Sequence, residues 1–290
     1  MPVSELERLI PAPPLRYHGG KWRLAPWIIR HFPPHAHYVE PFGGGASVLL
    51  QKAPSQLETY NDADGEVVTF FRVLRERPEA LVQAIALTPW ARAEYEATFD
   101  PLPPDHPDPD LERARRFYIR SWMSMGGATA RWRTGWRYQI RPQHPTTTER
   151  WRRLDRLYAV AERLRLVQIE QDDALEVIRR YDTPETLFYL DPPYVHSERS
   201  KWRGAAYRHE MSDDDHRRLA ELVHGLRGLV VISGYPSPLY QALYERYGWT
   251  RVETSARTNG ARTRTEALWL SPRTWASLSK AQFLFSEEAE

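Results

Sequence analysis

The chain has 290 residues, of which 41% are hydrophobic, so it can form one large domain or one domain with a sizeable insertion. It contains no cysteine, which excludes disulfides and thiolate metal sites and agrees with a cytoplasmic protein. No apolar run reaches the length of a membrane span, and the N-terminal segment lacks the basic and apolar regions of a signal peptide, so we expect no membrane anchor.

The basic residues are almost all arginine, although the net charge is only +2. Lysine accounts for four of the 40 basic residues, and arginines alternate with aromatic residues in RSWMSMGGATARWRTGWRYQIR, residues 120–141. Guanidinium groups bind phosphates and aromatic rings stack on bases, so this composition favours nucleic acid as a partner. A GC-rich genome would produce the same arginine bias without such a partner.

Short apolar runs alternate with segments of helical periodicity over most of the chain. This alternation predicts βαβ units and a mostly parallel sheet. The expected strands are His37–Glu40, Leu57–Tyr60, Leu166–Glu170, Leu187–Asp191, Leu229–Ser233, Trp249–Thr254 and Glu266–Ser271. The expected helices between them are Leu24–His31, Ala46–Lys52, Asp64–Arg75, Ala174–Arg180, Asp213–Leu226 and Pro238–Arg246.

The alternation of strands and helices is interrupted between residues 70 and 150. This part of the chain has helical patterns at Pro78–Ala86, Ala91–Thr98 and Asp110–Met125, and a glycine- and arginine-rich loop or hairpin follows at Gly126–Gln143. We therefore predict an inserted, mainly helical domain at residues 70–150. Residues 1–69 and 151–290 are expected to form the α/β domain into which it is inserted.

Residues suited to ligand binding follow the first three expected strands. The turn Gly43, Gly44, Gly45 has no side chains and lets the backbone approach a ligand closely. Asp62 lies about twenty residues further on, at the spacing typical of a carboxylate that binds ribose hydroxyls. Asp172 and Asp173 follow the third strand, where they would lie near an adenine ring. The pattern indicates a nucleotide-like ligand, although unrelated turns rich in turn-forming residues would give similar residues.

The fourth strand ends in DPPY, residues 191–194. Asp and Pro are common where strands end, so the tetrapeptide alone is compatible with a simple turn. Two successive prolines, however, fix the backbone and hold the Asp191 carboxylate, the Pro192 carbonyl and the Tyr194 ring in one arrangement. We interpret this turn as the reactive part of a site at the carboxyl ends of the strands.

Taken together, these motifs resemble the Dam-like, alpha-group DNA N6-adenine methyltransferases over nearly the whole chain. RYHGGK (16–21) resembles the W-x-G-G-K element, VEPFGGGASV (39–48) the S-adenosyl-L-methionine (AdoMet) motif, and YNDAD (60–64) the ribose-binding element. QDDALEVI (171–178), DPPY, VVISGY (230–235) and ARTNGARTRTEALWL (256–270) resemble the later motifs. Tyr17 and Ala46 depart from the family's Trp and Gly, and residues 124–140 do not reproduce the GATC-specific pattern, which leaves the target sequence open.

The resemblance implies a Rossmann-like, AdoMet-dependent methyltransferase fold with an inserted target-recognition domain. It implies methyl transfer from AdoMet to the N6 amine of an adenine flipped out of DNA, with Lys21 pairing with the AdoMet carboxylate. The catalytic residues that it implies are Asp191, Pro192, Pro193 and Tyr194. The cofactor-binding residues are Tyr17, Lys21, Glu40, Pro41, Phe42, Gly43, Gly44, Gly45, Asp62, Asp173 and Asp191.

Double-stranded DNA is the expected partner of a monomeric enzyme that needs no metal, and a cognate restriction endonuclease is a further candidate. We assign DNA contacts to Arg131, Arg133, Arg137, Asn259 and Arg262. The rival interpretations are an N4-cytosine methyltransferase, a methyltransferase of RNA or of protein glutamine, an NAD-dependent oxidoreductase, and an inactive DNA-binding module. Asp191 argues against an N4-cytosine methyltransferase, where Ser is usual at this position, and against a methyltransferase of RNA or of protein glutamine, where Asn is usual. The lack of a clean G-x-G-x-x-G argues against the oxidoreductase, and the intact DPPY argues against the inactive module.

Overall fold

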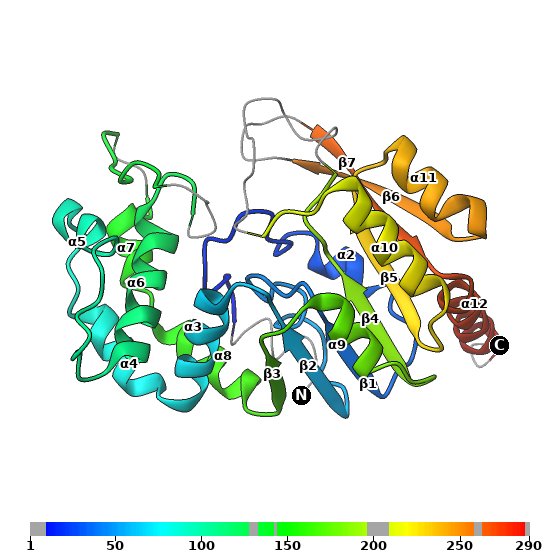
Figure 1. Cartoon of the computed structure of the whole chain (residues 1–290), viewed down its shortest axis with the longest axis horizontal. Helices are drawn as coiled ribbons and strands as arrows, with labels where there is room; N and C mark the ends of the chain where they lie inside the picture. The colour runs from blue at the N-terminus through cyan, green and yellow to red at the C-terminus, as the bar shows by residue number, and fades with distance from the viewer. Residues whose placement is uncertain (1–9, 128–132, 142–143, 196–208, 258–262, 288–290) are drawn as a thin grey trace.

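The structure is a computed structural model that describes residues 10–127, 133–141, 144–195, 209–257 and 263–287. Within these residues the chain forms one mixed sheet with helices on both faces and a group of helices beside it (Figure 1). None of the described helices is both long enough and apolar enough to cross a membrane.

The described strands form a seven-stranded sheet in the order β3-β2-β1-β4-β5-β7-β6. They are β1 (His37–Glu40), β2 (Leu57–Asn61), β3 (Val167–Glu170), β4 (Thr186–Leu190), β5 (Leu229–Gly234), β6 (Thr250–Arg257) and β7 (Thr263–Leu270). The first five in the order are parallel, whereas β7 is antiparallel to both β5 and β6. The strands expected from the sequence are thus present, and the α/β, Rossmann-like fold is confirmed.

Side chains of the central strands alternate between two hydrophobic cores, one on each face of the sheet. On one face, Val39 and Phe188 pack in a core shared with α9 (Ala174–Arg180) and α10 (Asp213–His224). Their chain neighbours Tyr38 and Leu187 belong to the core of the opposite face. Because both faces are covered, the ends of the parallel strands are where loops can form a site.

The sequence predicts most of the remaining helices but misses three. The described helices other than α9 and α10 are α2 (Ala25–Ile29), α3 (Gly65–Glu76), α4 (Pro78–Ala86), α5 (Arg92–Ala97), α6 (Pro109–Met123), α7 (Thr147–Trp151), α8 (Asp155–Leu164), α11 (Pro238–Leu243) and α12 (Pro272–Glu287), with a 3₁₀ turn at Glu245–Tyr247. The missed helices are α7, α8 and α12. In α8 the buried apolar residues Leu157, Val160, Ala161 and Leu164 recur at helical spacing, so the sequence did contain a signal for this helix.

The helix expected at Ala46–Lys52 is a series of turns instead. Ala46 leaves the glycine turn with a φ of +54°, in the left-handed region that helices avoid. The hydrogen bonds that follow are mixed, because Leu50 N donates to Ala46 O, four residues back, whereas Gln51 N donates to Val48 O, three residues back.

Helices α3 to α8, which we call the helical group, lie at one side of the sheet (Figure 1). The buried rings of Phe70 on α3 and Tyr118 on α6 stack with a centroid distance of 5.9 Å. This core is continuous with the core on one face of the sheet. The first predicted domain boundary, at residue 70, falls within α3. The second, at residue 150, separates α8 from the rest of the helical group in sequence, but α8 packs on α3. The division of the chain into two domains stays a prediction.

Residues 123–125 pair in antiparallel fashion with residues 135–137. Met125 N donates to Gly135 O over 2.9 Å, and Arg137 N donates to Met123 O over 2.6 Å. This pairing extends the helical group beyond the end of α6.

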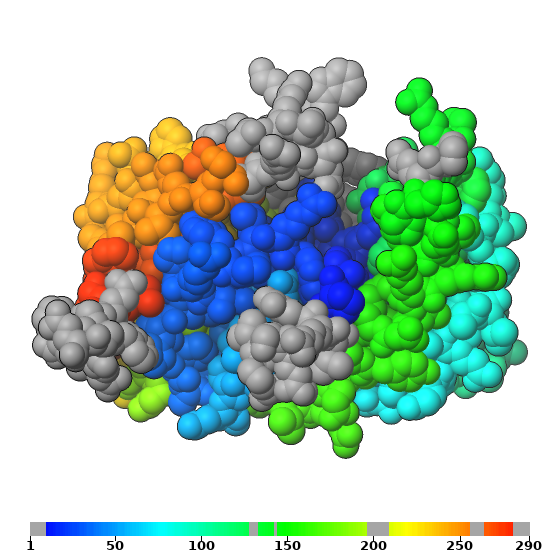
Figure 2. Space-filling model, turned by 180° about the vertical axis from the view of Figure 1, so that it is seen from behind, coloured from blue at the N-terminus to red at the C-terminus, as the bar shows by residue number. Residues whose placement is uncertain are grey.

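The N-terminal segment connects the sheet to the helical group. Arg16 N donates to Ser121 Oγ on α6 over 2.7 Å, and the Arg16 guanidinium donates to the carbonyls of Trp122 and Ser124. Figure 2 shows the N-terminal part of the chain, in blue, across the back of the molecule between the helical group and the side of β6 and α11.

Candidate active site

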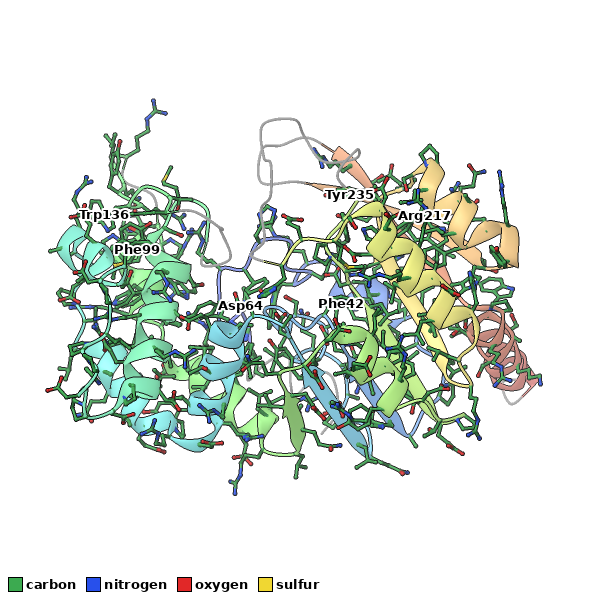
Figure 3. The ribbon with its side chains drawn as sticks, viewed as in Figure 1. Phe42, Asp64, Phe99, Trp136, Arg217 and Tyr235 are labelled. Atoms are coloured by element: carbon green, nitrogen blue, oxygen red, sulfur yellow. The ribbon has the colours of Figure 1, made fainter. Side chains whose placement is uncertain are left out.

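A cavity of about 480 Å³ is lined by the loops that follow β1, β2, β3 and β4. Figure 3 shows two of its lining residues, Phe42 and Asp64, at the ends of the strands between Tyr235 on one side and Trp136, beside α6, on the other. The lining includes all eleven residues that the sequence predicts to bind the cofactor: Tyr17, Lys21, Glu40, Pro41, Phe42, Gly43, Gly44, Gly45, Asp62, Asp173 and Asp191. The fold therefore brings these distant residues together, and their binding role stays a prediction.

The glycine turn after β1 is packed against two tyrosine rings. A Cβ atom at Gly43 would lie 2.2 Å from Tyr60 Cε2, and one at Gly44 would lie 2.7 Å from Tyr17 Cε1. Gly44 also has a φ of +48°, and its carbonyl accepts a hydrogen bond of 2.7 Å from the Tyr60 hydroxyl. The sequence explains these glycines by ligand approach alone, whereas the structure shows that close packing of the turn also requires them.

The Asp62 carboxylate joins the loops that follow β1 and β2. Its two oxygens accept hydrogen bonds from Gly44 N and Asp64 N, each over 2.8 Å. Burial raises the pKa of Asp62 to about 6, and the nearby Asp64 carboxylate acts in the same direction, while the two amide donors oppose the rise. Each oxygen keeps a second lone pair, so Asp62 can accept further hydrogen bonds from a ligand in the cavity.

The two aspartates that follow β3 have different surroundings. Asp173 caps α9 by accepting a hydrogen bond of 2.9 Å from Leu175 N, and it lines the cavity. Asp172 forms an ion pair of 2.6 Å with Arg180 and is not part of the lining. Of the two aspartates that the sequence proposes near an adenine ring, Asp173 is therefore the better placed.

Glu40, at the end of β1, is a buried carboxyl group on the wall of the cavity. Its Oε2 accepts hydrogen bonds from the Tyr38 hydroxyl over 2.9 Å and from Leu49 N over 3.1 Å. Burial raises the pKa of Glu40 to about 8, and the charge of Asp191 acts in the same direction. Ionisation of this group is therefore costly unless a cation lies nearby.

The turn DPPY places Asp191 at the edge of the cavity, with both carboxylate oxygens held by neighbours. Oδ1 accepts a hydrogen bond of 2.7 Å from the Ser233 hydroxyl on β5, and Ser233 Oγ accepts one of 3.2 Å from the Tyr189 hydroxyl. Oδ2 lies 2.9 Å from Lys21 Nζ, which also donates to Gly19 O. Lys21, predicted to pair with a cofactor carboxylate, thus contacts the carboxylate of the DPPY turn.

The rest of the turn continues along the same edge of the sheet. Pro192 is buried, and Pro193 lines the cavity. The Tyr194 hydroxyl donates to Glu266 Oε2 on β7 over 3.0 Å, and its ring meets the Tyr235 ring edge to face with a centroid distance of 4.6 Å. Burial raises the pKa of Tyr194 well above its ordinary value, so the hydroxyl keeps its proton at neutral pH.

Three residues around this turn were not among the predicted site residues. They are Ser233, Tyr235 and Glu266, which contact Asp191 or Tyr194. A sequence signal existed, because all three lie in the segments VVISGY and ARTNGARTRTEALWL that resemble family motifs. Their proximity to DPPY depends on the pairing of β4 with β5 and of β5 with β7, which the sequence does not reveal.

The predicted DNA contacts are only partly covered by the structure. Arg131, Asn259 and Arg262 lie outside the described residues. Arg133 lies 3.8 Å from Glu96 and 4.8 Å from the centre of the Phe99 ring, so its side chain contacts the helical group. Arg137 is partly buried, and burial together with the charge of Arg150 lowers its pKa.

Comparison with known proteins identifies the family. The family model of the D12 class N6 adenine-specific DNA methyltransferases matches residues 17–258. The Type II methyltransferase M1.LlaDCHI of Lactococcus lactis subsp. cremoris is 27% identical over 266 residues, which cover 85% of this chain and 89% of that protein. The DNA adenine methylase of Escherichia coli (strain K12) is 25% identical, with the same coverage of both chains. The chain therefore belongs to the D12 class of N6 adenine-specific DNA methyltransferases and is an enzyme that methylates adenine in DNA at specific sites.

Proposed function

We propose that this methyltransferase binds AdoMet in the cavity at the carboxyl ends of β1 to β4. We further propose that it methylates an adenine that has been flipped out of double-stranded DNA towards the DPPY turn. The observation that carries this proposal is the position of Asp191, which belongs both to the DPPY turn and to the lining of the cavity. A cofactor in the cavity and a base at the turn would therefore meet at one carboxylate.

The charge of the cavity supports AdoMet as the cofactor. Among the described lining residues, seven carry carboxyl groups, whereas four carry basic groups: Lys21, Arg218 and the imidazoles of His18 and His209. AdoMet carries a net positive charge at neutral pH, because its sulfonium and ammonium groups outweigh one carboxylate. A cation would relieve the unfavourable ionisation of Glu40 and Asp62. A volume of about 480 Å³ also suits a ligand of this size.

Specific roles within the cavity follow from the positions of its polar groups. Asp62, at the end of β2, would accept hydrogen bonds from the ribose hydroxyls. Asp173, at the start of α9, would lie at the adenine end of the cofactor. Lys21 would bind the carboxylate of AdoMet from the same place where it contacts Asp191.

The proposed chemistry needs a better nucleophile than a free adenine amine, whose lone pair is delocalised into the ring. The Asp191 carboxylate and the Pro192 carbonyl would accept the two N6 protons and favour a tetrahedral nitrogen with an available lone pair. AdoMet supplies a methyl group activated by its sulfonium. The N6–methyl bond would form as the sulfur–methyl bond breaks, which leaves S-adenosyl-L-homocysteine, and one N6 proton would then pass to water. Asp191 would stabilise the positive charge that develops on nitrogen, and Tyr194 would stack on the flipped base.

Target recognition and partners are further parts of this proposal. Residues 70–150 would recognise the DNA sequence, because the strand ends are already used for cofactor and base. Similarity to a protein named a Type II methyltransferase supports a cognate restriction endonuclease as a partner. We propose a monomer that acts in the cytoplasm.

A single experiment tests the proposed reaction. Purified protein is incubated with duplex DNA and AdoMet labelled on the methyl group, and the digested nucleosides are analysed by mass spectrometry. We expect the label in N6-methyl-2′-deoxyadenosine and its disappearance in Asp191→Ala. Label in N4-methyl-2′-deoxycytidine, or undiminished labelling by Asp191→Ala, would contradict the proposal.

A further inference from the structure

We propose that Glu266 is a positioning residue for base binding, because its carboxylate fixes the ring of Tyr194 through a hydrogen bond to the phenol. A fixed ring would present a constant stacking surface to the flipped adenine. This inference rests on the proposed function, in which Tyr194 stacks on the target base.

The two prolines fix the backbone of the turn but not the rotation of the Tyr194 side chain, so the ring needs support from outside its own segment. Residues 191–195 have no regular secondary structure, so backbone hydrogen bonds of a strand or helix do not fix the direction of the side chain. The hydrogen bond of 3.0 Å from Tyr194 Oη to Glu266 Oε2 joins residues that are 72 positions apart. Glu266 lies on β7, one residue before Ala267, which pairs with Gly234 of β5. The acceptor is therefore part of the rigid sheet.

The two functional ends of the DPPY turn are held in the same way. Ser233, on β5, donates to the Asp191 carboxylate over 2.7 Å, and Glu266, on the next strand β7, accepts from the Tyr194 hydroxyl. Neighbouring strands thus provide one contact for the group that activates the amine and one for the ring that binds the base. This arrangement indicates that the sheet maintains the position of the Asp191 carboxylate relative to the Tyr194 ring.

Further contacts restrict the same ring. Tyr235 meets Tyr194 at an interplanar angle of 82°, and Lys21 Nζ lies 4.6 Å from the centre of the Tyr194 ring. Arg264 lies over Tyr235, with its guanidinium carbon 5.2 Å from the ring centre. Rotation of the Tyr194 side chain would disturb these contacts, so loss of its hydrogen bond should loosen the whole cluster.

Charges around Glu266 act on its pKa in opposite directions. Burial and the charge of Asp191 raise the pKa of Glu266, whereas Lys21, Arg264 and the hydrogen bond from Tyr194 oppose the rise. A second carboxylate beside Asp191 is electrostatically unfavourable, and a neutral side chain would avoid this repulsion. An ionised acceptor, however, forms a stronger hydrogen bond with the phenol.

A double-mutant cycle tests the inference, after methylation-site sequencing has identified the target sequence. The variants are Glu266→Ala, Tyr194→Phe and the double variant, and the readout is the single-turnover methylation rate at saturating AdoMet. We expect each single change to lower the rate about tenfold and the double change to lower it no further, because all three remove one hydrogen bond. Effects that multiply to about a hundredfold in the double variant would overturn the inference.

Two further measurements separate positioning from stability. With 2-aminopurine at the target adenine, Glu266→Ala should give brighter fluorescence than the unaltered enzyme, since the base is flipped but less well stacked. Glu266→Gln, which keeps an acceptor, should recover a rate within about threefold of the original. A fluorescence identical to that of the unaltered enzyme, or a Gln variant as slow as Ala, would count against the inference.

Control variants keep the outcomes distinguishable. Glu253→Ala removes a carboxylate from β6 that pairs with Arg251, and it should leave the rate unchanged. If Glu266→Ala does not fold, Tyr194→Phe alone decides, because a normal rate in that variant would mean that the hydrogen bond is not needed. Asp191→Ala separates failure of this inference from failure of the proposed function. Full activity in Asp191→Ala would mean that the proposed function is wrong. If Asp191→Ala is inactive but the effects of Glu266→Ala and Tyr194→Phe multiply in the double variant, only the role of Glu266 is wrong.

Discussion

The helical group and the cavity at the strand ends both contain many charged side chains, but they arrange them in opposite ways. In the helical group, arginines of α6 are paired with acids: Arg113 and Arg120 both lie 2.8 Å from Glu66, and Arg116 lies 2.7 Å from Glu112. In the cavity, acidic groups outnumber basic ones, and the pKa values of Glu40 and Asp62 are raised.

This difference shows which charges are available to a ligand. Paired side chains in the helical group stabilise the packing of α3 on α6, so an arginine-rich composition alone is weak evidence for DNA binding. Other arginines have different neighbours: burial and the charges of Arg137 and Arg150 lower the pKa of Arg16 to about 10. Arg137, whose pKa is lowered by burial and by the charge of Arg150, is therefore a better candidate for a phosphate contact than the paired arginines of α6.

The strongest test of the comparison is a matched pair of aspartate substitutions. Asp191→Ala should lower the methylation rate by about 10²–10³-fold with little change in AdoMet affinity, because the carboxylate acts mainly in the transition state. Asp172→Ala removes an aspartate that is ion-paired outside the cavity lining, and its rate should stay close to normal. Single-turnover kinetics and calorimetry provide the two readouts. Equal losses in both variants would show that position at the cavity edge does not matter.

AdoMet binding should depend on pH through Asp62. Its ionised form is the better acceptor for ribose hydroxyls, and its pKa of about 6 means that protonation competes with binding below that pH. Affinity should therefore fall as the pH drops from 7 to 5. Asp62→Asn should bind roughly tenfold more weakly at pH 7 and lose this dependence. Calorimetry across this range checks both points, and an unchanged slope in Asp62→Asn would assign the titration to another group.

Glu40 should make the protein less stable at alkaline pH. Its pKa is about 8 in the folded protein and near 4.5 in the unfolded chain, so the folded state binds more protons between these values. The contribution of Glu40 to the free energy of unfolding is therefore fully present below pH 4.5 and is lost as the pH rises through 8. Glu40→Gln should reduce the difference in unfolding free energy between pH 5 and pH 8 by about 1 kcal/mol or more. Urea titrations at both pH values, without AdoMet, would reveal an unaltered difference if the assignment is wrong.

Local sequence signals predicted the strands and the cavity lining better than they predicted contacts between distant strands. The glycine turn and DPPY are visible because glycine and proline impose particular backbone geometries. Glu266 was missed because its contact with Tyr194 depends on the antiparallel β7, whose neighbour in the sheet cannot be read from its own residues. The pairing of Arg116 with Glu112, in contrast, follows from their four-residue spacing within a helix that the sequence predicts.

The smallest expected effect distinguishes available from paired arginines. Arg137→Ala should weaken binding to DNA of any sequence about threefold to fivefold, and the slope of log affinity against log salt should become shallower by about 0.9 if Arg137 contacts one phosphate. Arg116→Ala should leave this slope unchanged and lower stability by about 0.5–1 kcal/mol, because it breaks an ion pair within α6. Fluorescence anisotropy with a random-sequence duplex at several NaCl concentrations measures the slopes, and urea titration measures stability. If Arg116→Ala changes the slope as much as Arg137→Ala does, ion pairing inside the helical group does not prevent an arginine from contacting DNA, and the contrast between the two regions would not extend to DNA binding.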